Sequence, residues 1–380
     1  MSLSQKAGAL ALVFVVLSLL ACSLPIPLLL PSPTPEAIPC ATRMHPPTLP
    51  PRPPFPTPTW TVSPTRTAFP SITPKAKPTH AATSSPHIVA PTILSQVDYQ
   101  VVETIVLTNA GPGVVERLTL WVALIRSLEP YQFVLDHEVQ PAPVEWLNDE
   151  YGNSYARIEF ANLAAGESVE TTVTNTVRVN ELAHDLSLCF GDTPSTFLDP
   201  ETFVESDDPD IQALARELSS DRGNACESLR ALYDYVADHI SYTTYESGDR
   251  GAVWALDNGS GDCTEFADAL LALSRAAGIP ARFLEGVTYR EEERQDPNQI
   301  KHDWLEAYLP GHGWVPLDPT WGRFAYRRDA YFARISPDHI IVTVGRNLST
   351  LGRYHYFYYN WSGTDVSLSH QEAWTVSKAP

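Results

Sequence analysis

The chain has 380 residues, with 26 Lys and Arg against 45 Asp and Glu, and a formal net charge of −19. Residues before Asp98 hold six of the basic and one of the acidic side chains, which leaves 20 against 44, about −24, on the remainder. Such a charge argues against nucleic-acid binding, and the length beyond the N-terminal segment suits two modest domains.

The N-terminus predicts export from the cytoplasm. Lys6 precedes an apolar run, Ala7 to Leu20, which is too short to span a bilayer comfortably and is typical of a signal peptide. The following Ala21-Cys22 completes a segment that resembles a bacterial lipobox, which implies a signal peptide over 1–22 and lipidation of Cys22. An ordinary cleaved signal peptide and an uncleaved anchor are the alternatives. Each places the rest of the chain outside the cytoplasm, and the lipobox predicts a protein anchored to the membrane by lipid.

Residues 23–96 have the composition of a disordered stalk. About twenty of the 34 prolines lie in this segment, mixed with Ser and Thr. Such a sequence cannot bury a core, and its prolines favour extended polyproline II. A ligand for a proline-binding module is the alternative interpretation.

Residues 97–200 predict an antiparallel β-sandwich. Short segments rich in β-branched and aromatic residues alternate with turns such as Ala110–Gly113. The strand candidates are 101–107, 118–125, 155–160 and 169–177. No catalytic pattern is evident there, so the region is interpreted as a structural or substrate-orienting module.

From Pro209 onward the hydrophobic period becomes helical, over 211–218 and 229–240. Strands are then predicted at 281–289, 302–309 and 313–318, the last two joined by a turn at 310–313. Helices followed by an antiparallel sheet predict an α+β domain.

Cys263 lies where a long helix is expected to begin. Asp262 is a good N-cap, and Glu265 three residues later matches a capping box. Free N–H groups and the helix dipole at this position favour a thiolate, which is the nucleophilic form of cysteine. The alternative is a small buried cysteine that only packs in the core.

The hairpin at 310–313 supplies partners for that thiol. His302 near the start of one strand and Asp318 at the end of the next are predicted to lie roughly opposite each other, so the carboxylate could orient the imidazole. His312 is expected to be solvated at the hairpin tip, and His339 and His355 have no motif nearby. No Cys/His spacing matches a zinc site, so we expect neither metal nor cofactor.

The remaining site candidates rest on weaker patterns. Cys189 and Cys226 flank the junction of the two regions and could form a disulfide, while Cys40 lies in the stalk. Trp254, Asp262 and Trp304 could line the site or help to bind an oxyanion, although core packing is the alternative for each tryptophan. These assignments leave Cys263 as the unpaired thiol.

Three blocks together resemble the transglutaminase-like superfamily. They are Gly261-Asp-Cys-Thr-Glu-Phe-Ala with Leu273-Ser-Arg-Ala-Ala-Gly-Ile-Pro-Ala-Arg282, His302-Asp-Trp-Leu-Glu-Ala-Tyr, and Gly313-Trp-Val-Pro-Leu-Asp-Pro-Thr320. The resemblance implies a papain-like catalytic domain over 205–335, preceded by a β-domain and followed by a strand-rich extension over 336–380. It also implies Cys263 as nucleophile, His302 as base and acid, and Asp318 as the residue that orients His302.

The implied reaction is acyl transfer on protein or peptide amides through a thioester. Hydrolysis and transamidation remain open, because water or an amine could resolve that thioester. Two alternatives also stay open: a non-enzymatic surface module that binds a protein partner, and hydrolysis of a glycosylated asparagine amide.

Overall fold

The computed structural model describes residues 88–243, 248–291 and 300–379. The predictions for the signal peptide, for Cys22 and for most of the stalk therefore fall outside the described residues. The first strand, β1 (Thr92–Asn109), begins five residues inside the segment assigned to the stalk. No helix among the described residues is both long and apolar enough to cross a membrane.

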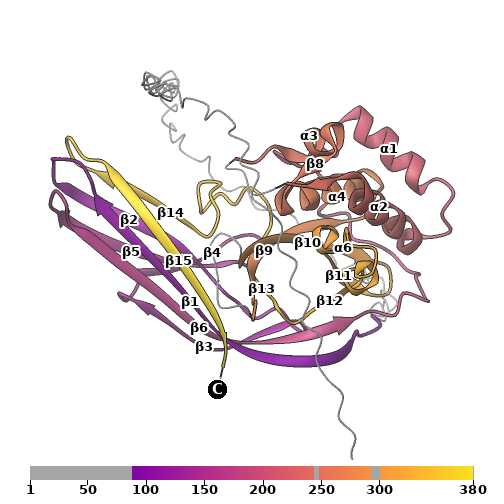
Figure 1. Ribbon diagram of the computed structural model, residues 1–380, viewed down its shortest axis with the longest axis horizontal. Helices are drawn as coiled ribbons and strands as arrows, with labels where there is room; N and C mark the ends of the chain where they lie inside the picture. Colours follow the sequence, from indigo (N-terminus) through magenta and orange to yellow (C-terminus); the bar gives the residue numbers. More distant parts are fainter. Residues whose placement is uncertain (1–87, 244–247, 292–299, 380) are drawn as a thin grey trace, which may run out of the picture. The chain divides into compact units, whose positions relative to one another are not determined.

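Two antiparallel sheets form the β-region, as the alternating pattern predicted (Figure 1). One contains β12 (Arg334–Ile335), β6 (Ser168–Ala183), β1 and β15 (Leu368–Lys378), with β3 (Gln132–Gln140) also paired to β6. The other has the order β14 (Phe357–Ser362), β2 (Val115–Leu124), β5 (Ser154–Leu163) and β4 (Glu145–Asn148). Along β1, buried residues alternate with half-buried ones from Val101 to Asn109, because successive side chains of a strand point to opposite faces.

In the α+β region, helices pack against a third sheet, which is also antiparallel. Its helices are α1 (Pro209–Ser219), α2 (Ala225–His239), α3 (Gly251–Asn258) and α4 (Cys263–Ala276). Its sheet has the order β11 (Gly313–Leu317), β10 (Lys301–Leu309), β9 (Ala281–Thr288) and β13 (His339–Val344). Helix α4 contacts α1, α2 and α3 as well as β9 and β10, so its start is held from several directions (Figure 1).

Short elements complete the α+β region. Helix α6 (Pro319–Gly322) follows β11 directly, and the 3₁₀ turn η1 (Arg328–Ala330) comes shortly after it. Strands β7 (Ser241–Tyr242) and β8 (Ser260–Gly261) pair in parallel and bring the end of α2 beside the start of α4.

The C-terminal extension is divided between the two regions. β13 joins the sheet of the α+β region through β9, whereas β14 and β15 pair with β2 and β1 of the β-region. One hydrophobic cluster accordingly combines inward residues of the β-region with Leu284, Val287 and Trp304 of the α+β sheet. A second cluster contains the helices and residues such as Phe283 and Leu305.

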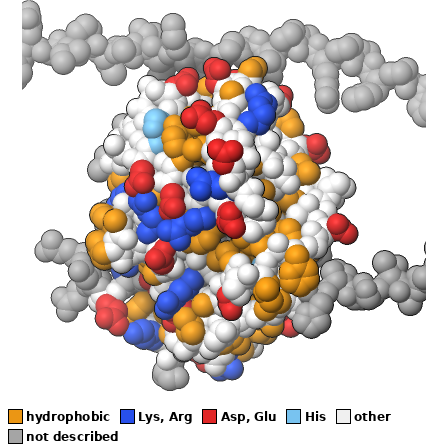
Figure 2. All heavy atoms as spheres, turned by 90° about the vertical axis from the view of Figure 1, so that its right-hand side faces the viewer, with side chains coloured by type: hydrophobic (Ala, Val, Ile, Leu, Met, Phe, Trp, Pro, Cys, Tyr) orange, Lys and Arg blue, Asp and Glu red, His pale blue; other side chains and the backbone are white. Residues whose placement is uncertain are grey.

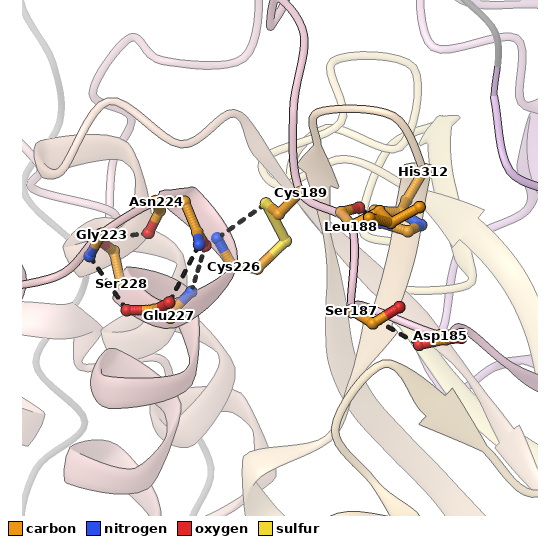
Figure 3. The surroundings of a disulfide bond; sticks show 10 residues. All are labelled: Asp185, Ser187, Leu188, Cys189, Gly223, Asn224, Cys226, Glu227, Ser228 and His312. Atoms are coloured by element: carbon orange, nitrogen blue, oxygen red, sulfur yellow. Dashed lines mark hydrogen bonds between the residues drawn. A yellow bond between two sulfur atoms is a disulfide. The ribbon is translucent and has the colours of Figure 1, made fainter.

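A disulfide joins α2 to the segment between β6 and α1, residues 184–208 (Figure 3). It joins Cys189 and Cys226, whose Cα atoms are 6.1 Å apart. The same segment covers His312, whose Nε2 bonds to the Leu188 carbonyl oxygen, and His312 is only 3% exposed. The prediction of a solvated His312 was therefore wrong, because the hairpin tip is covered by a segment distant in sequence.

Side chains of the β-region hydrogen-bond the edge of β13. Gln132 both donates to the Ile341 carbonyl and accepts from the Ile341 N–H, at 2.9 Å each. Asn153 makes the equivalent pair with Val344, at 2.8 and 2.9 Å. The Tyr131 hydroxyl donates to the His339 carbonyl at 2.6 Å. These bonds satisfy backbone groups that an edge strand would leave unpaired, and they fix the position of His339.

Candidate active site

Helix α4 begins with the capping box that the sequence predicted. The Asp262 carboxylate accepts a hydrogen bond from the Thr264 N–H at 2.9 Å, and the Glu265 carboxylate accepts one from the Asp262 N–H at 3.0 Å. These reciprocal bonds pair N–H groups that a helix start leaves unsatisfied. Cys263 is the first helical residue, half-buried, and it is the free cysteine among the described residues.

Carboxylates surround the thiol more closely than the sequence indicated. Burial and the charges of Asp303 and Asp262 raise the pKa of Cys263 well above its ordinary value, although a backbone hydrogen bond from Asp303 opposes that shift. The expectation of a thiolate favoured by the helix start alone is not met, because nearby negative charge outweighs the backbone N–H groups. The bond from Asp303 nevertheless places the sulfur beside the strand residue that directly follows His302.

Asp318 holds His302 and also begins the next helix. Its Oδ2 lies 2.9 Å from His302 Nε2, and its Oδ1 accepts a hydrogen bond from the Trp321 N–H at 3.0 Å, which makes it the N-cap of α6. Asp318 is 0% exposed and His302 is 5% exposed. The carboxylate is thus fixed at both oxygens, as is needed for a group that orients an imidazole.

A second histidine, His339, contacts the same carboxylate. Its Nε2 is 3.2 Å from Asp318 Oδ2, and its Nδ1 is 2.8 Å from Asp338 Oδ1. Burial alone would lower the pKa of His339, but Asp338 and Asp318 raise it to about 9. Burial alone would raise the pKa of Asp318, but His302 and His339 together hold it far below its ordinary value. The raised pKa of His339 favours its imidazolium form, and that form, together with His302, favours the ionised form of Asp318.

Sequence reasoning missed His339 because it arrives from β13, without a local motif. A possible signal was a histidine preceded by an aspartate at the start of the apolar run Ile340–Val344, since a polar side chain entering a buried strand needs a partner. His355 was also set aside. It lies against Glu285, whose charge is the main cause that raises the pKa of His355 to about 11.

Aromatic rings enclose His302. The Trp304 ring stacks on it with centroids 5.7 Å apart, and the Trp321 ring lies 5.9 Å away. Trp304 is fully buried and its indole nitrogen has no hydrogen-bond partner among the described residues. Trp254, by contrast, lies on α3 under the guanidinium of Arg250, at 4.3 Å. Of the two tryptophans, Trp304 is the one in contact with the candidate base.

Behind Cys263 lies a group of buried acids. The Thr264 hydroxyl donates to Asp303 Oδ2 at 2.6 Å, and burial together with Glu285 raises the pKa of Asp303 to about 7. Arg346 pairs with Asp268 at 3.0 Å and with Asp249 at 2.9 Å. Of these residues, Asp303 is the one whose charge contributes to the raised pKa of Cys263.

The residues around Asp318 also include potential metal ligands. His302, Asp318 and His339 each offer one ligand atom, and these atoms lie within 4.8 Å of one another. Two imidazoles and a carboxylate suit a transition metal such as zinc. Direct hydrogen bonds among the three side chains already account for their arrangement.

Comparison with known proteins identifies the domain that carries these residues. Residues 212–319 match the family model described as the transglutaminase-like superfamily. The chain therefore contains a transglutaminase-like domain, as its three sequence blocks indicated. The fold is α+β, with a papain-like core and an accompanying β-region.

Two curated relatives each match 30% of the chain. The uncharacterized protein YebA of Bacillus subtilis (strain 168) is 32% identical over an alignment of 130 residues that covers 30% of this chain and 17% of YebA. A protein-glutamine gamma-glutamyltransferase of Pseudomonas aeruginosa is 36% identical over an alignment of 124 residues that covers 30% of this chain and 18% of the relative. The chain thus spans less than a fifth of each relative.

A solved structure shares the fold more widely. The crystal structure of a candidate cysteine protease from Cytophaga hutchinsonii aligns with a TM-score of 0.54 at 17% identity. The alignment covers 76% of this chain and 100% of that protein. The likeness therefore extends beyond the transglutaminase-like domain and includes the β-region, as a likeness of fold.

Proposed function

We propose that the protein is a thiol enzyme that transfers acyl groups from protein or peptide amides, with Cys263 as nucleophile, His302 as general base and acid, and Asp318 as the orienting carboxylate. The observation that carries this proposal is the 2.9 Å contact between His302 Nε2 and the fully buried Asp318. His302 lies in β10, and the backbone of the next residue, Asp303, hydrogen-bonds the Cys263 sulfur. The transglutaminase-like domain supports the same assignment.

The first chemical step is a proton transfer. Asp318 engages Nε2 of His302, so Nδ1 remains to accept the thiol proton. The sulfur then bonds to the amide carbon, and the tetrahedral oxyanion is stabilised by backbone N–H groups at the start of α4. His302 returns the proton to the amine as the C–N bond breaks, leaving a thioester. Water or a second amine then attacks the thioester carbon while His302 accepts a proton from it. The C–S bond breaks, and His302 returns the proton to the Cys263 sulfur.

The acidic surroundings suit this order of events. Ionisation of Cys263 alone would add a negative charge beside Asp303 and Asp262, which explains the raised pKa of the thiol. Transfer of the proton to His302 creates an imidazolium at the same time, and the negative charge of Asp318 stabilises it. The geometry therefore favours a thiol that is deprotonated by His302 during the reaction, rather than a free thiolate.

The test is a substrate screen by mass spectrometry with the wild-type protein and Cys263→Ala. Glutamine-containing peptides are incubated with and without a primary amine, because deamidation, cleavage and amine incorporation give different mass changes. We expect one of these products from the wild type and none from the variant. Equal product from both proteins would overturn the assignment of Cys263.

A second candidate function is a non-enzymatic surface module that binds a protein partner. The raised pKa of Cys263 favours it, since a thiol without an effective base would be unreactive. Alkylation by iodoacetamide near neutral pH separates the two. Our proposal expects the alkylation of Cys263 to slow in His302→Ala, because His302 accepts the thiol proton, whereas the binding module expects the same rate in both proteins and no product in the screen.

We further propose that the protein is an extracytoplasmic lipoprotein anchored through Cys22. The Cys189–Cys226 disulfide supports an oxidising compartment, and the apolar run before Cys22 supports a lipobox. Membrane fractionation tests the anchor, because Cys22→Ala should move the protein out of the membrane fraction. Retention of that variant in the membrane would contradict lipidation at Cys22.

A further inference from the structure

Beside the candidate active site, arginines stack on partly exposed aromatic rings. The set comprises Tyr242, Trp321, Arg323, Phe324, Tyr326 and Arg327, which we call the arginine–aromatic surface. Tyr242, Phe324 and Tyr326 are 45%, 39% and 84% exposed. Figure 2 shows Lys and Arg side chains beside hydrophobic ones, with Asp and Glu side chains among them, on the right-hand side of the view in Figure 1.

The surface adjoins both candidate catalytic side chains. The Arg327 guanidinium lies 4.9 Å from the centre of the Trp321 ring, and that ring is 5.9 Å from His302. The Arg323 guanidinium lies 4.5 Å from the Tyr242 ring. Burial and the charge of Cys263 are the leading causes that raise the pKa of Tyr242, so this ring is in electrostatic reach of the sulfur.

Among the residues that the structure describes, no carboxylate forms an ion pair with either arginine, although the chain is strongly acidic. Arg323 donates to the Thr320 carbonyl and Arg327 to the Tyr331 hydroxyl. Arg275, by contrast, pairs with a glutamate at 2.7 Å.

The positive charges of Arg323 and Arg327 lie close together, so an anion bound between them would be favourable. Burial is the main cause that lowers the pKa of Arg323, and the charge of Arg327 adds to it, while Tyr242 and Asp318 oppose the shift. The two neighbouring guanidiniums therefore repel each other. A guanidinium stacked on a ring keeps its planar face covered and its N–H fork directed at carboxylate groups. Exposed rings beside it are typical of surfaces that bind polypeptide.

We propose that the arginine–aromatic surface binds an acidic stretch of the polypeptide substrate next to the amide that Cys263 attacks. The occupant is a peptide with Asp or Glu side chains near the reacting residue, whose carboxylates pair with Arg323 and Arg327. The position of the reacting amide rests on the proposed function, whereas binding of the acidic peptide does not require catalysis.

Binding is therefore measured in the full chain carrying Cys263→Ala, by fluorescence anisotropy. The probes are two fluorescein-labelled peptides with one glutamine, flanked by glutamates in the first and by serines in the second. We expect the glutamate peptide to bind about tenfold more tightly, the size expected from two half-exposed ionic contacts, and salt to reduce the difference. Equal affinity for the two peptides would overturn the proposal.

Substitutions assign the preference to particular residues. Arg323→Gln with Arg327→Gln should abolish it, while Arg117→Gln, an exposed arginine on β2, should preserve it. The charge-preserving pair Arg323→Lys and Arg327→Lys should retain part of it. This second pair and the salt dependence keep the proposal testable if the glutamine variants unfold. A preference that survives in folded glutamine variants would contradict the assignment.

Two further readouts distinguish peptide binding from catalysis and from membrane contact. If the glutamate peptide binds through the two arginines but no product forms in the presence of Cys263, the surface stands and the proposed acyl transfer fails. Vesicles that contain anionic phospholipid test whether the two arginines bind a membrane surface instead of an acidic peptide. Vesicle binding that depends on both arginines, without any peptide preference, would overturn the substrate assignment in favour of a membrane contact.

Discussion

Two acidic side chains, one in each region, are almost equally buried, yet their pKa values are shifted in opposite directions. Asp318 is 0% exposed and Glu103, in β1, is 1% exposed. Asp318 meets two imidazoles and a backbone N–H, and its pKa lies far below the ordinary value. Neither oxygen of Glu103 has a hydrogen-bond partner among the described residues, and burial with the charge of Glu372 raises its pKa well above the ordinary value.

The difference shows that bonding partners, rather than depth, decide whether a buried acid is charged. Both residues lose the solvation of water, which disfavours the carboxylate. His302 and His339 replace that solvation at Asp318, so the α+β region keeps a fixed negative charge where an imidazolium must form. Glu103 occupies an inward position of β1, between Val101 and Ile105, without such compensation.

The largest expected effect is that of Asp318→Asn, which removes the charge and preserves the shape. Asparagine cannot stabilise an imidazolium, and its amide favours the wrong tautomer of His302, so kcat should fall by about 10⁴-fold. Glu103→Gln is the matched control, because the same change at an uncharged acid should leave kcat within about twofold. Thermal unfolding of both variants checks the fold. Equal losses of activity in the two variants would contradict the comparison.

A smaller effect is expected at His339, which acts through Asp318 as a positioning residue. His339→Gln removes the positive charge that keeps Asp318 ionised, so kcat should fall by about 10- to 100-fold with little change in KM. His137→Gln, at an exposed position on β3, is the control. An unchanged kcat in a folded His339→Gln protein would show that Asp318 needs only His302.

Stability against pH gives an independent test of the same residue. Its pKa is raised from 6.5 to about 9 by Asp338 and Asp318, which face it together with His302 and Tyr331. This contribution to stability is full below the unfolded value and is lost as pH rises through about 9. Urea unfolding between about pH 6 and pH 10 should therefore show a fall in the wild type that is smaller in His339→Gln. Identical slopes in the two proteins would contradict a charged His339.

The sequence predicted the parts of the site that depend on local patterns. The capping residues Asp262 and Glu265, the start of α4 at Cys263 and the hairpin turn at 310–313 follow from short-range rules. His302 and Asp318 could be paired because a tight hairpin separates them.

His339 could not be predicted because its neighbours are set by sheet order. β13 joins the sheet beside β9, and Tyr131 and Gln132, about two hundred residues earlier, fix its edge. The negative environment of Cys263 was missed for a similar reason. Asp303 lies in β10 and contacts Cys263 only in the folded chain, whereas the sequence pattern around Cys263 shows only the helix start.

The smallest expected effect lies at Glu103 itself. Replacement by Met removes two unpaired oxygens from the interior, so at about pH 8 the free energy of unfolding should rise by about 1–3 kcal/mol. The raised pKa means that the contribution of Glu103 to stability is most favourable below the ordinary value of 4.5 and falls as pH rises toward the folded value. Glu103→Met should lack this fall.

Urea unfolding across this pH range measures both effects, with Glu116→Met at an exposed position of β2 as the control. A variant that loses stability at about pH 8 would mean that Glu103 is ionised and paired, with Lys301 as the nearby cation. In that case both regions would contain an ionised buried acid, and Asp318 and Glu103 would differ only in which cations stabilise them. A gain in stability instead leaves Asp318 as the carboxylate whose burial is compensated and whose charge the proposed chemistry uses.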